Sequence, residues 1–356
     1  MTLKKRKKEK LILKYYVGIC GHYGGKKVFL DGQTVKTKNV TSELIKKYGQ
    51  QRVVTVDTYG GVKSLLKCLK KLHFMLKNCE NIIILPAHNS IKIFPFFLVV
   101  LNQFYHRKLH YIVIGGWLPE FVKSNYHISK VLKRLDYIYV ETSTMQKELV
   151  RQGFKNIIIM PNFKRLNIIS SELLSHQYAK PFRLCTFSRV MKQKGVEDVI
   201  DVVNKINDKR GQTIFKLDIY GQIDSDYEED FNKLKEEFST YVEYRGAVPA
   251  EKSVDILRDY FALVFPTHFY TEGIPGTIID AYAAGVPVIA SKWESFKDVI
   301  EDGITGFGYE FGNKAELQKR LEYIADNPKL IINMKSACIE KADQFMPENA
   351  ILKMKL

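Results

Sequence analysis

Short apolar runs alternate with longer amphipathic segments along most of the chain, and this alternation limits the folds that it can adopt. Strands that are apolar on both faces are typical of parallel sheets covered by helices, because a crossover between parallel strands needs a helix or a long connection. The pattern predicts an α/β fold with doubly wound parallel sheets. In the first half the predicted strands are Tyr15–Cys20, Val53–Asp57, Ile82–Leu85, Tyr111–Ile114, Tyr137–Val140 and Ile157–Met160, and the predicted helices include Ser42–Tyr48, Val62–Lys77 and Phe121–Leu135.

The alternation stops after Met160-Pro161-Asn162-Phe163 and begins again at Phe182. Residues 166–180 are polar and show little periodicity, which is typical of a linker. Since 356 residues exceed what one hydrophobic core comfortably serves, we expect two domains, at 1–165 and 181–341. The strands predicted for the second domain are Phe182–Phe187, Ile214–Tyr220, Val242–Tyr244, Ala262–Phe265 and Val286–Ala290, and its helices are Val196–Asp208, Glu229–Phe238, Pro249–Tyr260, Gly276–Ala284 and Lys314–Asp326.

The formal net charge of +16 is concentrated in the first half of the chain. Residues 1–180 carry 32 Lys and Arg against 10 Asp and Glu, a net charge of +22, whereas the remainder carries 23 against 29, a net charge of −6. This asymmetry indicates an anionic partner for the first half, either a membrane leaflet or nucleic acid, although lysines on solvated faces also contribute to the total. Because no groove-reading motif accompanies the charge, we do not expect nucleic acid binding.

Cysteine usage and hydropathy favour a cytoplasmic protein. The five cysteines are scattered, odd in number and free of C-x-x-C spacing, so they predict neither a disulfide framework nor a zinc site. The basic opening segment Met1–Lys10 leads into a predicted strand rather than into a signal-peptide core. The apolar run Ile93–Leu101 is far shorter than the roughly 20 residues that cross a bilayer, and it is interpreted as a buried or interfacial helix.

The segment Phe265–Ser291 carries the clearest chemical signal. An apolar strand ends there, the carboxylate Glu272 enters a Gly-rich turn, and a helix begins near Gly276. Helix N-termini bind phosphate oxygens through free amides and the positive end of the helix dipole, so the amides near Gly276, Thr277 and Ile278 are predicted to face a ligand. Asp280, one helical turn further, is predicted to reach ligand hydroxyls.

This segment closely resembles glycosyltransferase family 4. The family carries a Glu, seven residues and a second Glu, followed by Ala-x-Ala-x-Gly-x-Pro-Val-Ile-Ala; here Glu272 is followed by seven residues, Asp280 and Ala281-Tyr-Ala-Ala-Gly-Val-Pro-Val-Ile-Ala290. In the family the first carboxylate contacts the donor sugar and the second holds ribose hydroxyls. The resemblance implies these roles for Glu272 and for Asp280, which is one methylene shorter than the usual Glu.

A second match is Leu184–Gly195, which resembles the strand, Gly-Arg-Leu and Lys-Gly segment of the family. Arg189 and Lys194 keep the spacing of the pair that holds the donor diphosphate, and Ser188 replaces the usual Gly. Fixed cations suit this position because cleavage of a sugar–phosphate bond leaves a nucleoside diphosphate. Weaker matches place Gly221 in a donor-side Gly loop and Val248 beside the base, and the ordered set covers residues 155–345.

The first half resembles a bacterial polysaccharide-assembly branch of the family. Gly24 and Gly25 would let the first loop approach the donor diphosphate, with Gly32, Gln33 and Thr34 at the entry to the next helix. The residues considered for the acceptor side of the cleft are His22, His88, Asn89 and Trp117. Each histidine is better explained as a structural or hydrogen-bonded loop residue than as a general base, and Trp117 is also explained as a cover for the sheet end. Gly115-Gly116-Trp117 stands where many relatives place a catalytic His, so that His is not carried over.

The resemblance implies a GT-B fold, in which two Rossmann-like domains face each other across a cleft and the tail helix at about 342–356 returns to the first domain. It also implies a retaining, metal-independent glycosyltransferase of the hexosyl type that uses no cofactor. Glu272, Arg189 and Lys194 would form its catalytic group. The donor would be a nucleotide sugar and the acceptor a saccharide or a polyprenyl-diphosphate-linked glycan. The basic first domain would lie on the inner face of the plasma membrane.

Two alternatives stay open at this point. A GT-B-fold sugar-nucleotide epimerase would release sugar without an acceptor, and a degenerate domain would act as a scaffold or chaperone. Asp224-Ser-Asp226 has the spacing of a metal-binding Asp-x-Asp, but it lies in an acidic run before a helix and is interpreted as solvent-facing N-terminal helix charge. We therefore expect no metal site.

Overall fold

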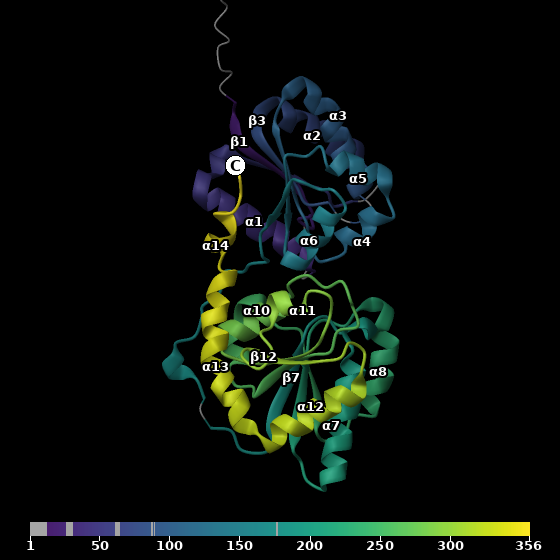
Figure 1. The fold of residues 1–356 in the computed structure, drawn as a ribbon, viewed down its shortest axis with the longest axis vertical. Helices are drawn as coiled ribbons and strands as arrows, with labels where there is room; N and C mark the ends of the chain where they lie inside the picture. Colours follow the sequence, from purple (N-terminus) through teal and green to yellow (C-terminus); the bar gives the residue numbers. More distant parts are fainter. Residues whose placement is uncertain (1–12, 26–30, 61–64, 87, 89, 176) are drawn as a thin grey trace, which may run out of the picture.

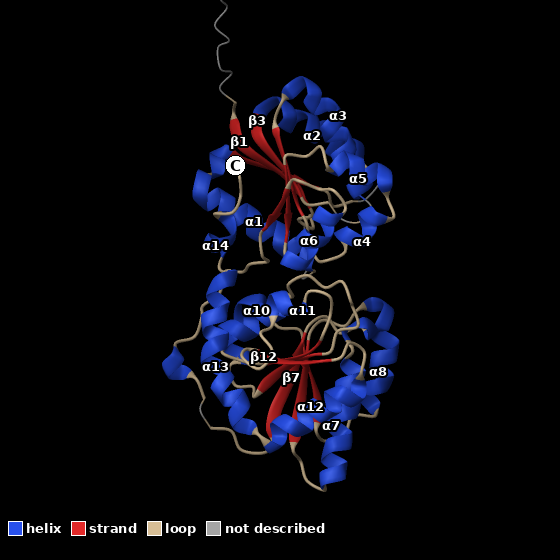
Figure 2. Ribbon diagram, viewed as in Figure 1, coloured by secondary structure: helices blue, strands red, loops and turns tan. Residues whose placement is uncertain are grey.

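The computed structural model describes residues 13–25, 31–60, 65–86, 88, 90–175 and 177–356. Within these ranges the strands form two six-stranded sheets, one in each half of the chain, and every strand pair is parallel. Figures 1 and 2 show the two sheets in separate lobes stacked along the long axis. The predicted α/β class, with two doubly wound parallel sheets, is confirmed.

The first sheet has the strand order β2-β1-β3-β4-β5-β6. Helices α2 to α6 contribute to the core on one face of this sheet, whereas α1 and α14 contribute to the core on the other face. The strands are β1 (Tyr15–Gly21), β2 (Val53–Asp57), β3 (Cys79–Ile84), β4 (Lys108–Ile112), β5 (Tyr137–Val140) and β6 (Ile157–Ile159). The helices are α1 (Gly32–Tyr48), α2 (Leu65–Asn78), α3 (Phe94–Tyr105), α4 (Leu118–Lys123), α5 (Tyr126–Leu132) and α6 (Ser143–Arg151).

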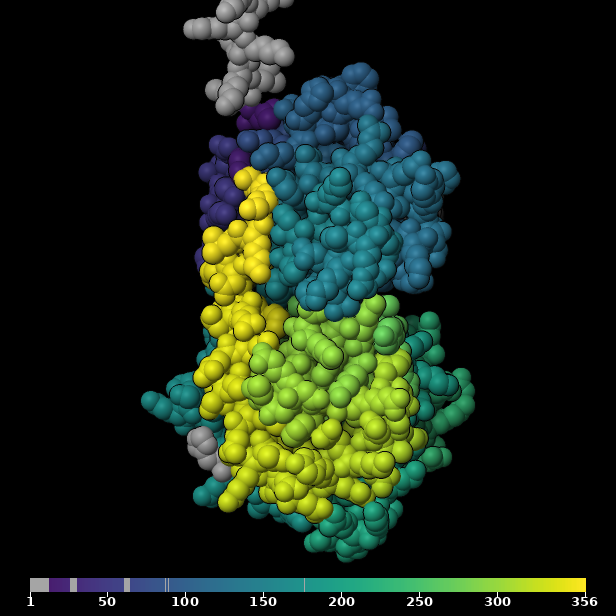
Figure 3. All heavy atoms as spheres, in the orientation of Figure 1, coloured from purple at the N-terminus to yellow at the C-terminus, as the bar shows by residue number. Residues whose placement is uncertain are grey.

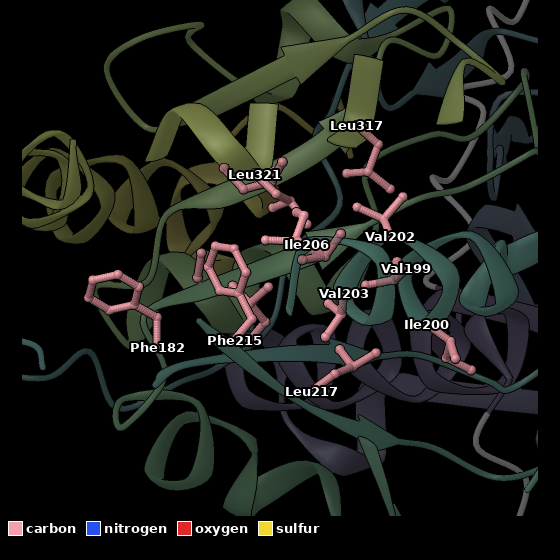
Figure 4. Close-up of a cluster of buried hydrophobic side chains, with 14 of the residues drawn as sticks. Phe182, Val199, Ile200, Val202, Val203, Ile206, Phe215, Leu217, Leu317 and Leu321 are labelled. Carbon is pink, nitrogen blue, oxygen red and sulfur yellow. The ribbon is translucent and has the colours of Figure 1, made fainter. Parts of the chain in front are cut away.

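The second sheet has the order β12-β11-β10-β7-β8-β9. Its strands are β7 (Phe182–Phe187), β8 (Phe215–Tyr220), β9 (Val242–Gly246), β10 (Ala262–Phe265), β11 (Val288–Ser291) and β12 (Gly306–Tyr309). The helices beyond β7 are α7 (Val196–Arg210), α8 (Glu228–Glu236), α9 (Ser253–Leu257), α10 (Gly276–Ala283), α11 (Phe296–Val299), α12 (Lys314–Asp326), α13 (Pro328–Ala342) and α14 (Pro347–Ile351). Figure 4 shows how apolar side chains of α7 and α12 meet those of β7 and β8 to form one core.

The C-terminal segment crosses from the second lobe back to the first, where Figure 3 shows it as a yellow band. Ala350 and Ile351 of α14 and Met354 are buried in the core beneath α1. The amide of Lys355 donates to the Tyr139 hydroxyl in β5 at 3.0 Å. The tail therefore forms part of the apolar core of the first lobe.

Both sheets reverse their strand order at one position, between β1 and β3 in the first and between β7 and β10 in the second. Loops that leave the carboxyl ends of strands at such a reversal diverge and leave a crevice between them, which is where open α/β sheets bind ligands. In the second sheet, Arg189 and Lys194 follow β7 and Glu272 follows β10. Among the described residues no helix is long and apolar enough to cross a membrane.

Candidate active site

A cleft of about 590 Å³ lies between the two lobes. The first lobe lines it with the start of α1 and the loops after β4 and β5, and the second with the loops after β7 to β10 and the start of α10. Of the residues predicted for the donor site, those that line this cleft are Ser188, Arg189, Lys194, Gly221, Val248, Glu272, Gly276, Thr277 and Asp280. These predicted donor residues extend over 92 positions of the sequence, from Ser188 to Asp280, and they meet at one cavity.

The N-terminus of α10 opens into this cleft. Gly276 and Thr277 are its first two residues, and both line the cavity. The Thr277 hydroxyl is buried and has no hydrogen-bond partner within the described part of the chain. Ile278 is not among the described residues that line the cavity, since its amide donates to the Pro275 carbonyl at 3.1 Å and its side chain is fully buried, and its donor-binding role stays a prediction. The Thr277 hydroxyl and the start of the helix are thus suited to a ligand oxygen.

Glu272 and Lys194 form an ion pair inside the cleft. Both side chains are mostly buried, and the Thr267 hydroxyl donates to the same Glu272 oxygen at 3.2 Å. The Lys194 ammonium lies 5.2 Å from the ring centre of Phe265 and at the same distance from that of Phe269. Aromatic faces and a carboxylate hold the ammonium in one place, so it is a fixed cation at the cavity wall.

Arg189 is the more exposed cation of the predicted pair. Its guanidinium donates to Asp224 at 3.2 Å, and its charge also acts on Asp31 across the cleft. Asp224 is more than a solvent-facing charge. Its carboxylate accepts the Asp226 amide at the start of a 3₁₀ turn, and it also forms an ion pair with Arg189. Among the described residues no cluster of three His, Cys, Asp or Glu side chains could hold a metal ion.

Asp280 is paired with a residue that the sequence did not single out. The Lys164 ammonium donates to both Asp280 carboxylate oxygens, at 2.6 and 2.7 Å. Burial raises the pKa of Asp280, while the neighbouring Lys164 charge opposes that shift. Hydroxyls of a bound ligand would therefore meet a lysine–aspartate pair here rather than a bare carboxylate.

A second unpredicted cation, Lys36, lies on the first lobe's side of the cleft. Its ammonium is 3.5 Å from Glu141 and donates to the Asn162 side-chain oxygen at 3.0 Å. The other Glu141 oxygen accepts the amide of Ile274, which belongs to the Gly-rich loop between β10 and α10. Burial lowers the pKa of Lys36, and Glu141 opposes that shift. One carboxylate thus joins a buried lysine of the first lobe to the loop that carries Glu272.

The two glycines predicted to approach the diphosphate lie elsewhere. Gly24 and Gly25 are not among the described residues that line the cleft. The Gly25 amide donates to Asp57 at 2.8 Å, and the Tyr23 amide donates to the other oxygen of that carboxylate at 2.9 Å. Asp57 therefore holds this loop against β2, and a donor-binding role for Gly24 and Gly25 stays a prediction.

The acceptor-side candidates form two separate groups, and none of those described lines the cavity. His22 contacts the Thr34 hydroxyl through Nδ1 at 2.8 Å, at the start of α1. The His88 ring stacks on Trp117 with centroids 4.3 Å apart, and Phe121 meets both rings edge-on. Asn89 falls outside the described residues.

A carboxylate of the second lobe caps a helix of the first. Asp298 in α11 accepts the amides of Ser143 and Thr144 at 3.0 and 3.1 Å and the Thr144 hydroxyl at 2.6 Å. Ser143 is the first residue of α6, so the negative charge lies at the positive end of that helix. Burial alone would raise the pKa of Asp298, but these hydrogen bonds outweigh it and the pKa is lowered.

Replacement of Asp298 by Asn should lower the free energy of unfolding by about 1 kcal/mol at pH 7. Because the pKa of Asp298 is lower in the folded state, its stabilisation is complete above the unfolded pKa of about 4 and is lost as the pH falls through the folded value. Urea unfolding from pH 7 to pH 3 should therefore show the difference between wild type and D298N shrinking at the acidic end. D326N, at the exposed Arg210–Asp326 pair, is the control and should show a smaller difference at pH 7; a difference for D298N that stays constant to pH 3 would contradict the assignment.

Comparison with known proteins gives matches of three kinds, to a family model, to a curated protein and to solved structures. Residues 175–345 match the family model described as glycosyl transferases group 1. An uncharacterized glycosyltransferase of Methanocaldococcus jannaschii is 23% identical over 231 residues, which is 62% of this chain and 56% of that protein. Among solved structures, HepE of Anabaena in complex with UDP aligns with a TM-score of 0.72 at 14% identity, covering 93% of this chain and 95% of that one. Sucrose-phosphate synthase of Thermosynechococcus elongatus aligns with a TM-score of 0.76 at 14% identity, covering 96% and 97%.

These similarities define the architecture. The fold is that of the GT-B glycosyltransferases, with two Rossmann-like lobes on either side of a cleft, as predicted. The match to the glycosyl transferases group 1 model covers residues 175–345, which contain β7 to β12 and α10. The chain spans about half the length, or less, of the curated relatives that it matches.

Proposed function

We propose that this protein transfers a sugar from a nucleotide-sugar donor to a saccharide acceptor. One observation carries the proposal: Arg189, Lys194, Glu272 and the N-terminus of α10 meet in a single cleft, where the buried Thr277 hydroxyl has no partner within the described residues. Two cations and a helix N-terminus suit a diphosphate, and a carboxylate beside them suits sugar hydroxyls. The group 1 domain and the UDP complex of HepE agree with this chemistry.

The reaction proposed is a metal-independent hexosyl transfer with retention at the anomeric carbon. Arg189 and Lys194 stabilise the negative charge that develops on the departing diphosphate. Glu272 orients the donor sugar, and the Asp280–Lys164 pair faces the ribose. No residue is assigned as a nucleophile, so the acceptor attacks from the face that the diphosphate leaves, and a phosphate oxygen takes the acceptor proton.

The acceptor proposed is a glycan or a polyprenyl-diphosphate-linked saccharide of a cell-surface polysaccharide. Its support is the resemblance of the first half to polysaccharide-assembly enzymes together with the net charge of +22 over residues 1–180. The protein would work at the cytoplasmic face of the membrane, where such acceptors are exposed and anionic headgroups attract a basic lobe.

A thermal-shift series with UDP, GDP, dTDP and ADP, each with Mg²⁺ or EDTA, tests the donor site. A nucleotide that binds only the folded protein raises the melting temperature by mass action. We expect one nucleotide, UDP first, to give a shift that EDTA leaves unchanged and that R189A abolishes. R210A, which breaks the exposed Arg210–Asp326 pair outside the cleft, is the matched control and should keep the shift.

The second candidate is a scaffold that has lost donor binding. The observation that favours it is the Lys164 ammonium, which occupies both oxygens of the Asp280 carboxylate. No shift with any of the four nucleotides would support the scaffold and contradict the transferase. A nucleotide-dependent release of free sugar without acceptor would instead indicate an epimerase.

A further inference from the structure

Helices α2 and α3 lie side by side on the outside of the first lobe (Figure 1). The His73 ring of α2 is hydrogen-bonded to the Tyr105 hydroxyl of α3 at 2.8 Å. This contact identifies the sides of the two helices that face each other. Leu66, Lys70 and Lys77 share the flank of His73, because successive members of the series Leu66, Lys70, His73 and Lys77 are three or four residues apart. The outer surface of this helix pair, α2 and α3 with Ile93, is called the α2–α3 face below.

The α2–α3 face exposes an unusual number of large apolar side chains. On and just before α3, Phe96 is 59% exposed, Phe104 78%, Val100 40% and Ile93 38%, while Leu66 on α2 is 75% exposed. The α3 residues recur every three or four positions, so they form one stripe opposite the buried Phe94, Leu98 and Val99. A contiguous exposed stripe of this kind marks an interaction surface.

The charged side chains of α2 on the α2–α3 face are all lysines, so their charge is positive. Lys67, Lys70, Lys71 and Lys77 on α2 are exposed, and none of them forms an ion pair within the described residues. Residues 58–119 contain eight Lys and Arg and a single acidic residue, Glu80. The lysines of the α2–α3 face are therefore available to an external anion.

We propose that the α2–α3 face docks this protein on an anionic lipid bilayer. Phenylalanine and leucine side chains enter the interfacial region, and the surrounding lysines contact anionic headgroups, which is the arrangement of interfacial amphipathic helices. A bilayer satisfies both features at once because it offers apolar depth beneath a continuous negative surface. A second copy of this chain would instead bring lysines against lysines across a two-fold axis.

The position of the α2–α3 face relative to the cleft adds to this inference, and this step rests on the proposed function. The β3–α3 loop joins the two regions: the Leu85 carbonyl accepts a bond from Gln33, which lines the cleft, and Ile93 begins the apolar stripe. His88 in the same loop stacks on Trp117. A lipid-linked acceptor held at the bilayer would pass the stacked His88 and Trp117 rings on its way to the cleft.

Sedimentation with vesicles tests the α2–α3 face. The full chain is mixed with vesicles of phosphatidylcholine alone or with about one third phosphatidylglycerol, at low and at moderate salt. We expect binding to the anionic vesicles that weakens with salt. F96S/F104S and, separately, K67Q/K70Q/K71Q should each reduce the bound fraction by about tenfold.

Two control variants test whether vesicle binding needs the α2–α3 face itself or only exposed leucines and lysines anywhere on the protein. L173S/L352S removes two leucines that are 63% and 75% exposed elsewhere, and K205Q/K216Q removes exposed lysines of the second lobe; both should bind as wild type does. Equal binding to both vesicle types, an equal loss in the control variants or wild-type binding by F96S/F104S would overturn the proposal. The proposal would also be overturned if the wild type does not bind vesicles but forms a concentration-dependent dimer that F96S/F104S abolishes.

The nucleotide thermal shift is measured on the same variants and should be unchanged. Failure of the docking proposal is therefore separable from failure of the proposed function.

Discussion

Replacement of Lys36 by Met should lower the free energy of unfolding by about 3–5 kcal/mol, because it leaves the Glu141 carboxylate buried without its cation. Lys36 and Glu141 are 2% and 4% exposed, so water cannot replace the lost partner. Glu141 also accepts the amide of Ile274, which belongs to the Gly-rich loop between β10 and α10 that carries Glu272. K36M should therefore weaken nucleotide binding as well. Urea unfolding and the nucleotide thermal shift measure the two effects.

The double variant K36M/E141Q separates the charge from the geometry. Since burial dominates the lowered pKa of Lys36, the ion pair has a large desolvation cost, and removal of both charges should restore most of the lost stability. K38M, two residues along α1 at an exposed position, is the control and should change stability by less than about 0.5 kcal/mol. A K36M variant as stable as K38M would show that the pair is not closed in solution.

Replacement of Gly221 by Ala should destabilise the second lobe by more than about 3 kcal/mol and abolish the nucleotide shift. An added Cβ would lie 1.8 Å from the Ser188 carbonyl oxygen and 3.3 Å from the Arg189 amide nitrogen. The backbone after β7 would have to move, and Arg189 would move with it. Thermal unfolding with and without nucleotide measures both results.

The control for this variant is G312A. Both glycines have positive φ, 138° at Gly221 and 72° at Gly312, but nothing lies within 4 Å of a Cβ at Gly312. G312A should therefore show only the conformational cost of about 1–2 kcal/mol and keep the nucleotide shift. Similar losses in the two variants would mean that the close approach to Ser188 does not matter.

Elements whose sequence follows a regular pattern could be predicted well. The bounds of β2, β5, β7, β10 and α12 agree with the predicted ranges, because each strand is a short apolar run and α12 keeps a regular helical period. Elements whose sequence departs from these patterns were missed. β12 reads Gly-Phe-Gly-Tyr, and its glycines hide a strand that pairs closely with β11.

The ends of the helices were predicted less well than the strands, because the hydrophobic periodicity does not show where a helix begins or breaks. α1 begins at Gly32, ten residues before the predicted Ser42, because the Asp31 carboxylate accepts the Thr34 amide and starts the helix there. The predicted helix Phe121–Leu135 is interrupted, since α4 ends at Lys123 and α5 begins only at Tyr126.

The second lobe's lining of the cleft could be predicted because its residues lie in ordered motifs after β7 and β10. Lys36, Glu141 and Lys164 could not, since each acts through a partner more than a hundred positions away. Lys36 in particular belongs to a polar stretch, Thr34-Val-Lys-Thr-Lys38, that has the composition of a solvated helix face. Its burial follows from Glu141, Asn162 and Phe163, residues more than a hundred positions away that no local pattern brings together with it.

The described chain passes between the lobes near Lys164 and again near Phe345, and the two passages are hydrogen-bonded to each other, from the Lys164 amide to the Phe345 carbonyl at 3.2 Å. Arg165 adds ion pairs to Glu43 of α1 and Glu348 of α14. A rotation that opened the cleft would have these two adjacent passages as its hinge, and atoms would move in proportion to their distance from that axis. Lys164 lies on the hinge itself, and its bond to Asp280 should persist while the far rim of the cleft admits and releases substrate.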